Sequence, residues 1–278
     1  MRDFENLIKS NLHTHTNFCD GADSPEDIVK SAISLGMETV GFSGHSFTPI
    51  DTSYCMSEEK TVQYVSEIER LNEIYGDRIN ILCGIEMDLF GKRPNRVFDY
   101  VIGSAHYVQL GGEYCPVDMG AEKQKEDIRR YCAGNPYQYV RAYFQNVARI
   151  PDTLPQCDVV AHFDLVSKYN EKNALFDEND PRFLNPACEA LDYLIERGMM
   201  VEINTGAILR GYRTFPYPTG LLMRRIAQKG GRVTLGSDAH RKEHLLGFFS
   251  RALGHLYCAG IGEVYSMTKN GWTPMSLY

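Results

Sequence analysis

The sequence lacks the features that mark membrane, secreted and disulfide-stabilised proteins. It has no run of about 18 apolar residues that could span a bilayer. Its N-terminal segment, up to His15, has no apolar signal-peptide core. The eight cysteines are scattered without a CxxC pair, which predicts reduced thiols in a chain without a secretion signal. These absences predict a cytoplasmic protein that has no membrane segment.

Positive charge is also in short supply. The chain has 29 lysines and arginines against 36 aspartates and glutamates, which gives a net charge of −7. A protein that binds nucleic acid without sequence preference normally carries a basic surface. We therefore expect no long nucleic acid as a partner, and the sequence gives no signal for the oligomeric state.

Several catalytic motifs are missing as well. The sequence contains no GxSxG elbow, no Walker loop, no GxGxxG and no HExxH. No cysteine has flanking residues typical of a nucleophile. These absences disfavour a serine hydrolase, a P-loop enzyme and a cysteine phosphatase.

What the sequence does contain is a regular alternation of short apolar runs and amphipathic helical stretches. Continuous apolar runs are typical of strands buried on both faces of a parallel sheet. The predicted strands are Asn11–Thr14, Thr39–Ser43, Ile79–Ile85, Tyr100–Ser104, Asp158–Ala161, Met200–Ile203 and Val233–Gly236.

Four of the predicted helices have clear boundary signals, with a capping residue or proline at the start and a glycine at the end. They run from Ser24 to Gly36, from Ser57 to Gly76, from Asn185-Pro186 to Gly198, and from Thr219 to Gln228 before Gly230.

Alternation of strands and helices predicts parallel βαβ units. Seven or eight such units favour a closed barrel, and 278 residues suit one α/β domain, 1–278. The stretch from Gly111 to Leu154 is longer and richer in Tyr, Asn and Pro. It is interpreted as an insertion after the fourth strand, with one or two helices over one end of the barrel.

Six of the eight histidines lie at or just beyond the C-terminal ends of predicted strands. Barrel active sites are built at that rim from the ends of several strands. His13 and His15, like Asp238 and His240, are two residues apart, so the side chains of each pair point the same way on an extended chain. The six histidines are His13, His15, His45, His106, His162 and His240.

Three acidic residues complete the candidate set. Glu86 ends the third predicted strand, Asp238 follows the last one, and Asp20 lies in a polar turn after the first. Each of the nine side chains alone has another explanation, as a core histidine, a capping acid or a turn residue. Together, those explanations require six of eight histidines to fall by chance at one rim of the barrel.

Nine ligands are too many for one ion, which takes about four to six, so the set predicts two or three divalent ions such as zinc, iron or manganese. A centre of several ions suits attack of a metal-bound hydroxide on phosphorus, and it neutralises charge on the phosphoryl oxygens. His244 and His255 lie off the pattern and are interpreted as surface or packing residues.

These residues resemble the polymerase and histidinol phosphatase (PHP) superfamily over essentially the whole chain. The resemblance implies a distorted, TIM-like (β/α)7 barrel with a trinuclear metal site. One ion would be held by His13, His15, Glu86 and Asp238, a second by Glu86, His106 and His162, and a third by Asp20, His45 and His240. The matching motifs are His13-Thr-His15 with Asp20, Gly44-His45-Ser46, Gly84-Ile-Glu86, Ser104-Ala-His106, Ala161-His162-Phe-Asp164 and Ser237-Asp238-Ala-His240.

Within the superfamily the chain looks most like the histidinol-phosphate phosphatase branch. That likeness implies a phosphomonoesterase of histidine biosynthesis, which hydrolyses L-histidinol phosphate to L-histidinol and phosphate. One departure is Ser167, where many relatives carry a basic residue. The segments that carry the likeness are Tyr114–Met119, Tyr137, Tyr143, His162–Tyr169 and Val201–Arg210.

Arg210 is the first candidate for a cation that holds the substrate phosphate, and Lys168 is the second, because Arg and Lys donate charge-assisted hydrogen bonds to phosphate. Either residue is equally explained as a solvated surface cation. Asp88, Glu113 or Asp118 are candidates to receive the cationic part of the substrate.

Two alternative functions stay open at this point. One is a PHP phosphoesterase that acts on nucleotides, oligonucleotides or phosphotyrosine. The other is a non-catalytic metal-binding domain, which the intact set of nine ligands disfavours.

Overall fold

The computed structural model describes residue 4 and residues 7–278. The prediction of an N-terminus without a signal-peptide core falls partly on residues 1–3 and 5–6, which lie outside the described residues. In the part of the chain that is described, no helix is long and apolar enough to cross a membrane.

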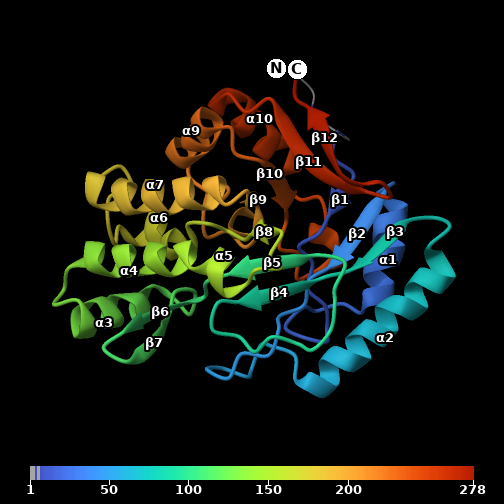
Figure 1. Ribbon diagram of the computed structural model, residues 1–278, viewed down its shortest axis with the longest axis horizontal. Coiled ribbons are helices and arrows are strands. Elements are labelled where there is room, and N and C mark those ends of the chain that lie inside the picture. The colour runs from blue at the N-terminus through green and yellow to red at the C-terminus, as the bar shows by residue number, and fades with distance from the viewer. Residues whose placement is uncertain (1–3, 5–6) are drawn as a thin grey trace.

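Two parallel ladders of short strands form the centre of the molecule (Figure 1). The smaller sheet has the order β1-β2-β3, and all of its pairs are parallel. Its strands are β1 (Ser10–Asn11), β2 (Thr39–Phe42) and β3 (Asn80–Cys83).

The larger sheet has the order β12-β11-β10-β9-β8-β5-β4, in which only the β11–β12 pair is antiparallel. Most of its parallel strands are fully buried, which explains why they form continuous apolar runs in the sequence. The strands are β4 (Ile85–Asp88), β5 (Val101–Ser104), β8 (Val159–Val160), β9 (Met200–Asn204), β10 (Val233–Gly236), β11 (Glu263–Thr268) and β12 (Gly271–Ser276).

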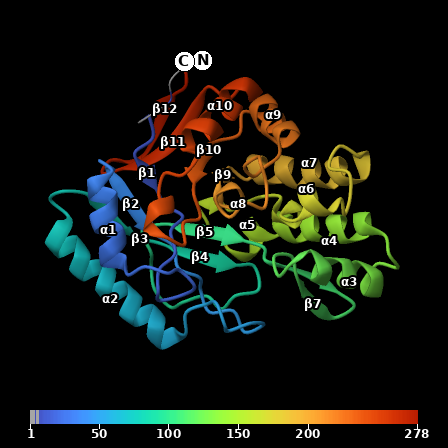
Figure 2. The same ribbon diagram turned by 180° about the vertical axis from the view of Figure 1, so that it is seen from behind.

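Helices cover the outside of these sheets. The α1 and α2 helices flank β1 to β3, α3, α4 and α7 lie on the opposite side, and α9 and α10 lie near the chain ends (Figures 1 and 2). Their bounds are α1 (Pro25–Ser34), α2 (Glu58–Tyr75), α3 (Ala121–Tyr131), α4 (Pro136–Ala148), α5 (Ile150–Thr153), α6 (Asn170–Asn173), α7 (Pro181–Glu196), α8 (Gly206–Leu209), α9 (Gly220–Lys229) and α10 (Phe249–Ala259), with 3-10 turns η1 (Leu165–Ser167) and η2 (Lys242–His244).

Three of the four predicted helices begin and end where the boundary signals indicated. The Ser24 hydroxyl accepts the N–H of Asp27 at the start of α1, and the Ser57 hydroxyl accepts that of Lys60 at the start of α2. Each bond satisfies one of the N–H groups that a helix start leaves free. The α9 helix ends at Gly230, in the left-handed conformation that favours glycine.

The predicted start of the remaining helix at Asn185-Pro186 is wrong. The α7 helix begins at Pro181, and the Asp180 carboxylate accepts the N–H of Arg182. A capping acid followed by proline at the first helical position is a better start than Asn185, so Pro186 lies inside the helix.

The predicted single strand Ile79–Ile85 is also wrong, because it is two strands in different sheets. β3 pairs with β2, β4 pairs with β5, and Gly84 lies between them. A Cβ atom on Gly84 would lie 2.2 Å from the ring of Tyr100. The chain therefore passes closely over this aromatic ring, and only glycine fits there.

The insertion is more than helical. It includes α3, α4 and α5, preceded by a two-stranded hairpin of β6 (Tyr107–Leu110) and β7 (Glu113–Pro116). Gly111 and Gly112 both have positive φ at the turn, which matches the tight turns of two-residue hairpins. A second hairpin, formed by β11 and β12 at the C-terminus, was not predicted.

Two isolated bridges connect the two sheets. Thr14 pairs with Ala239 beyond β10, and His45 pairs with Glu86 in β4. Both bridges are parallel, so the carboxyl ends of the strands meet at one edge. The described residues show a mixed α/β fold, with no continuous closed sheet.

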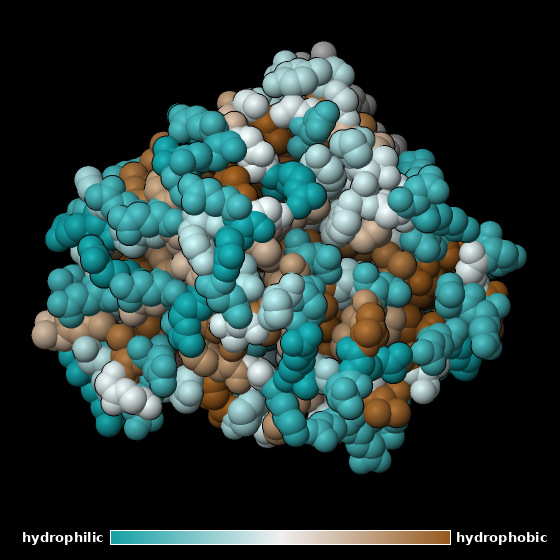
Figure 3. Space-filling model, in the orientation of Figure 1, coloured by the Kyte–Doolittle hydropathy of each residue, from teal (hydrophilic) through white to brown (hydrophobic). Residues whose placement is uncertain are grey.

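The distribution of hydrophilic and hydrophobic residues is that of a protein with a hydrophobic core between these sheets and helices. The face in Figure 3 is mostly hydrophilic, with hydrophobic residues in small separate patches. Inside, Val40, Phe42 and Ile85 are completely buried among the strands and helices. The fold therefore places one packed core behind the edge where the bridges meet.

Candidate metal centre

All nine candidate side chains meet at the carboxyl edge of the strands. Most of them follow a strand end within a few residues, but Glu86 lies inside β4 and not at the end of the strand before it. Seven of the nine residues are buried, His240 is partly exposed and Asp20 is exposed. The structure therefore brings together polar groups from segments more than 200 residues apart in sequence.

Glu86 lies at the centre of the cluster with 1% of its surface exposed. Five imidazoles approach its carboxylate, and a carboxylate has only about four positions at which it can accept a hydrogen bond. Its oxygens lie 3.0 Å from His45 Nδ1, 3.2 Å from His162 Nε2, 3.3 Å from His13 Nε2, 3.4 Å from His106 Nε2 and 3.5 Å from His15 Nε2.

The other two acids close the cluster on its open side. Asp20 comes from the turn after β1, and Asp238 comes from the segment after β10 with a positive φ of 50°. Asp20 oxygens lie 3.1 Å from His240 Nε2, 3.6 Å from His15 Nδ1 and 3.7 Å from His45 Nε2. The Asp238 Oδ1 atom lies 3.2 Å from His15 Nε2, 3.5 Å from His240 Nδ1 and 3.7 Å from His13 Nε2.

Four overlapping groups within the cluster have ligand atoms close enough to share one ion, and together they use all nine residues. These groups differ from the three sets that the family resemblance implies. His15 belongs to two of the groups, and His45 is grouped with Glu86 and His106 as well as with Asp20 and His240. The groups are His15, Asp20, His45 and His240; His13, His15 and Asp238; His13, Glu86 and His162; and His45, Glu86 and His106.

The donor atoms fit metal ions better than they fit one another. The buried His15 Nε2 and His162 Nδ1 atoms have no hydrogen-bond partner. The ring of His15 packs at 4.3 Å from that of His240 and at 4.4 Å from that of His45, centroid to centroid. Buried polar atoms without partners are costly, and a cation at the centre would satisfy His15 Nε2, whereas His162 faces the centre with its other nitrogen, Nε2.

The electrostatics favour an ionised Glu86 and a neutral His15. At His13 and His106 burial is outweighed by neighbouring carboxylates, since Glu202 and Glu86 raise the pKa of His13, and Glu86 raises the pKa of His106 to about 9. Burial raises the pKa of Glu86, but the neighbouring imidazoles of His45 and His13 outweigh it and hold the pKa well below the ordinary value. Burial and the adjacent His240 and His45 lower the pKa of His15 to about 3. Ionised carboxylates beside a neutral imidazole are a set of ligands suited to zinc, iron or manganese.

Two acids behind the cluster were not recognised as part of it. Glu202 in β9 places Oε1 at 2.7 Å from His13 Nδ1. Asp88 in β4 places Oδ2 at 3.2 Å from His106 Nδ1 and is 3% exposed. The prediction of Asp88 as a substrate-facing acid is therefore wrong, because it faces His106. The sequence signal that could have indicated both residues is an acidic residue inside a strand that is otherwise apolar.

A cavity of about 380 Å³ opens on the cluster. Arg210 and Lys168 both line it, as does Asp118 from the insertion, while Glu113 is exposed on β7 and does not. The lining also includes His45, Tyr54, Glu86, His106, Tyr107, His162, Asp238 and His240.

The two cations at the cavity are held differently. Arg210 donates to the Asp238 carboxylate at 2.7 Å and to the Asp238 carbonyl at 3.0 Å. Lys168 Nζ lies 3.7 Å from Asp118 Oδ2 and over the rings of Tyr169 and Tyr212. Arg210 is thus fixed against the cluster, while Lys168 keeps donor capacity toward the cavity. Ser167, which departs from the family pattern, is buried against Arg213 instead.

The remaining two histidines lie elsewhere. His255 in α10 packs its ring at 4.7 Å from that of Phe215, and His244 lies in η2. Among the described residues, neither belongs to a group that could hold a metal.

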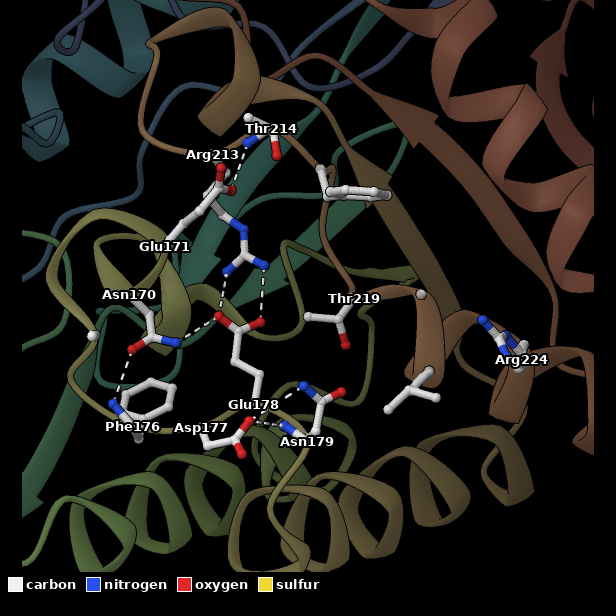
Figure 4. Close-up of a pocket in the computed structure, with 14 residues that line it drawn as sticks. Asn170, Glu171, Phe176, Asp177, Glu178, Asn179, Arg213, Thr214, Thr219 and Arg224 are labelled. Carbon is white, nitrogen blue, oxygen red and sulfur yellow. Dashed lines mark hydrogen bonds and ion pairs between the residues drawn. The ribbon is translucent and has the colours of Figure 1, made fainter.

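A second, larger hollow of about 1010 Å³ is lined by α6, the segment 176–179, the loop 213–215 and the start of α9 (Figure 4). The Glu178 carboxylate there accepts hydrogen bonds from the Arg213 guanidinium at 3.0 Å and from the Asn170 amide at 2.8 Å. Among the described residues, none of the candidate ligands lines it. Its size alone therefore does not make it the functional site.

The fold and the cluster define a class: a mixed α/β protein whose strand ends present a histidine and carboxylate centre able to take several metal ions. A family model described as the PHP domain matches residues 11–206. The chain belongs to this family.

Relatives agree with that assignment. The chain is 30% identical to a protein of Schizosaccharomyces pombe named "Probable histidinol-phosphatase", over 92% of this chain and 89% of the relative. It is 28% identical to "Histidinol-phosphatase" of Lactococcus lactis, over 84% and 85% of the two chains. The structure of histidinol phosphate phosphatase from Lactococcus lactis matches its fold with a TM-score of 0.71 at 21% identity, over 96% and 99% of the chains.

Proposed function

We propose that this protein is a metal-dependent phosphomonoesterase that hydrolyses L-histidinol phosphate to L-histidinol and phosphate. The observation that carries this function is the convergence of six imidazoles and three carboxylates on one cavity. The chain is also similar, over most of its length, to relatives that are named histidinol-phosphatases. The Lactococcus lactis structure was solved with zinc, L-histidinol and phosphate.

We propose that the nine side chains hold two or three divalent ions, with zinc as the first candidate and iron or manganese as alternatives. Glu86 is the natural bridging ligand, because both of its oxygens face imidazoles. Bound ions in such a centre supply hydroxide at neutral pH and offset charge on the phosphoryl group.

The chain's own residues then orient the substrate. Arg210 fixes Asp238 and presents its guanidinium at the edge of the cavity. The Lys168 ammonium group has a longer contact, 3.7 Å to Asp118, than the 2.7 Å contact of Arg210 with Asp238, so Lys168 has more donor capacity left for a phosphate oxygen. Asp118 lines the same cavity and can accept the substrate ammonium group, so phosphate and amine would be held at neighbouring positions.

A finer description of the fold belongs to the same proposal. The two isolated bridges join β10 to β1 and β2 to β4, which makes a ring of seven strands when they are added to the parallel ladders. We therefore propose a distorted (β/α)7 barrel in one domain, residues 1–278, with the insertion over the rim that carries the cavity.

The cavity also supports a small-molecule substrate. Its volume of about 380 Å³ is lined by both acids and bases, whereas a groove for long nucleic acid would need a continuous basic surface. Nucleic acid is therefore not part of the proposed function.

The test combines metal analysis with a substrate panel. The purified chain should contain divalent metal, lose phosphatase activity on exhaustive chelation and regain it when zinc, iron or manganese is added. Histidinol phosphate should be the preferred substrate among histidinol phosphate, nucleoside phosphates and phosphotyrosine. Turnover of the other substrates with histidinol phosphate untouched would reject the proposed substrate, and fully metallated protein without turnover would reject the enzyme.

A further inference from the structure

Glu202 lies in the middle of β9 with 1% of its surface exposed, directly beneath the proposed metal centre. Its Oε1 atom is 2.7 Å from His13 Nδ1. Its Oε2 atom accepts the backbone N–H of His162 at 2.9 Å and the side-chain amide of Asn204 at 2.8 Å. One carboxylate therefore contacts two candidate ligands that come from different strands.

We infer that Glu202 is a positioning residue, which sets the orientation and the tautomer of His13 and fixes the backbone of His162. The inference rests on the proposed metal centre. An ionised carboxylate can only accept hydrogen bonds, so a hydrogen on His13 must be on Nδ1. The lone pair of His13 Nε2 is then directed to the centre, where Glu86 Oε2 lies at 3.3 Å and Asp238 Oδ1 at 3.7 Å.

The hydrogen bond from the His162 N–H to Glu202 has a second effect, on the backbone of His162. His162 has a positive φ of 23°, a conformation that side-chain-bearing residues rarely adopt. The hydrogen bond from its N–H to Glu202 compensates for this conformation. The ring can then place Nε2 at 3.2 Å from Glu86 Oε1. Glu202 thus acts on both sides of the central acid.

Glu202 is itself held tightly. A Cβ atom on Gly236 of the neighbouring strand would lie 1.8 Å from Glu202 Oε1, so glycine is needed beside the carboxylate. Asn204, which donates to Glu202, also accepts the N–H of Gly206 at 2.8 Å. Buried acids that orient metal-binding histidines in this way influence metal affinity strongly.

The Glu202→Gln substitution tests the inference because it keeps the shape and changes the hydrogen bonding. In one orientation, the amide NH2 faces His13 Nδ1 and moves the ring hydrogen to Nε2. In the other, it faces two donors, His162 N–H and the Asn204 amide. We expect a roughly 10- to 100-fold loss of zinc affinity, measured by competition with a chromogenic chelator, and a lower kcat at little-changed KM.

Asp127→Asn is the matched control, because Asp127 is a fully buried acid in α3 outside the metal centre. It should leave zinc affinity and kcat unchanged. A role for Glu202 in packing alone would lower the melting temperature and leave the zinc affinity of the folded protein unchanged.

If Glu202→Gln does not fold, Glu202→Asp decides the question, because it retains the charge but is too short to reach both His13 and His162. Zinc affinity within about twofold of the unaltered chain in either folded variant would overturn the inference while leaving the proposed function intact. Failure of the unaltered chain to bind zinc, iron or manganese would overturn the proposed function and this inference together.

Discussion

Charged side chains have different kinds of partner in the groove lined by Glu178 and in the cavity at the histidine cluster. In the groove between α6 and the start of α9, Glu178 faces a guanidinium and an amide, which are ordinary hydrogen-bond partners (Figure 4). In the smaller cavity, Glu86 faces five imidazoles, and the buried His15 Nε2 has no hydrogen-bond partner. The groove has the greater volume. Of the two, the smaller cavity is the one where the described residues include groups of ligand atoms that could bind a cation.

This difference gives different expectations for substitutions at the two places. Removing a charge at the groove should affect folding stability, since Glu178 and Arg213 neutralise each other. Removing a ligand at the cavity should affect metal binding and turnover, because the ions and the reaction depend on that side chain. Variants at the two places therefore test whether the division between stability and function is real.

The largest effect is expected for the double substitution His13→Ala/His15→Ala. Both rings lie within 3.5 Å of Glu86, and His15 also approaches Asp238 and Asp20. Loss of both should remove bound metal and lower kcat on the order of 10³-fold or more, because metal ions supply several kcal/mol of transition-state stabilisation. Elemental analysis, phosphate release and far-UV circular dichroism measure metal content, turnover and fold.

The substitution His255→Ala is the control for this experiment, since His255 packs against Phe215 away from the cluster. It should retain metal and activity. Full metal content in the His13/His15 double variant would contradict the assignment of these strand ends as ligands.

A smaller effect is expected for Asp88→Asn. The Asp88 carboxylate lies 3.2 Å from His106 Nδ1 and accepts the His106 N–H at 2.9 Å. An amide in its place can donate its NH2 to His106 Nδ1, which moves the ring hydrogen to Nε2, the nitrogen that faces Glu86. Metal affinity should fall about 10- to 100-fold, measured by chelator competition. Glu113→Gln, on the exposed β7, should change nothing.

The sequence alone was enough to anticipate that the nine side chains converge, and the reason is geometric. Parallel strands end at a common edge, and residues two apart, such as His13 and His15, share a face there. The same reasoning found the α1, α2 and α9 helices, whose boundaries depend on local residues such as Ser24 and Gly230.

The contacts of Glu202 and the division at Gly84 were beyond sequence reasoning, because each depends on a partner far along the chain. Glu202 meets His13 across 189 positions, and nothing near Glu202 indicates which ring nitrogen it will contact. Gly84 separates two strands because the ring of Tyr100 occupies the space beside it. Similarly, Pro186 is tolerated inside α7 because the stronger start at Asp180 precedes it.

Lys168 should influence substrate binding more than metal binding. Replacement by Met should raise KM for the phosphomonoester about tenfold, since a charged hydrogen bond contributes about 1.5–3 kcal/mol, and should leave metal content unchanged. Burial lowers the pKa of Lys168, although Asp118 partly opposes this. The ammonium group is therefore lost at a lower pH than that of an ordinary lysine, and KM should rise with increasing pH before ordinary lysines lose their charge.

The Lys168→Arg variant separates charge from shape in that experiment. Arginine stays protonated throughout the accessible range, so the alkaline rise in KM should disappear. An identical pH profile of KM in the two proteins would show that Lys168 does not bind the phosphate.

The smallest effect on activity is expected at the groove, from Glu178→Gln. The change leaves Arg213, which is 4% exposed in its side chain, without its ionic partner, although Ser167 still accepts from it at 2.8 Å. A buried charge that loses one partner costs about 1–3 kcal/mol, so the midpoint of urea unfolding should fall. Metal content should stay unchanged and kcat should change less than about threefold. The exposed pair of Glu69 and Arg96 offers a control, because Glu69→Gln removes an ion pair of a kind that contributes less than about 1 kcal/mol. A variant at Glu178 that is as stable as the unaltered chain but has lost turnover would show that the groove acts in catalysis, against the division between the two hollows.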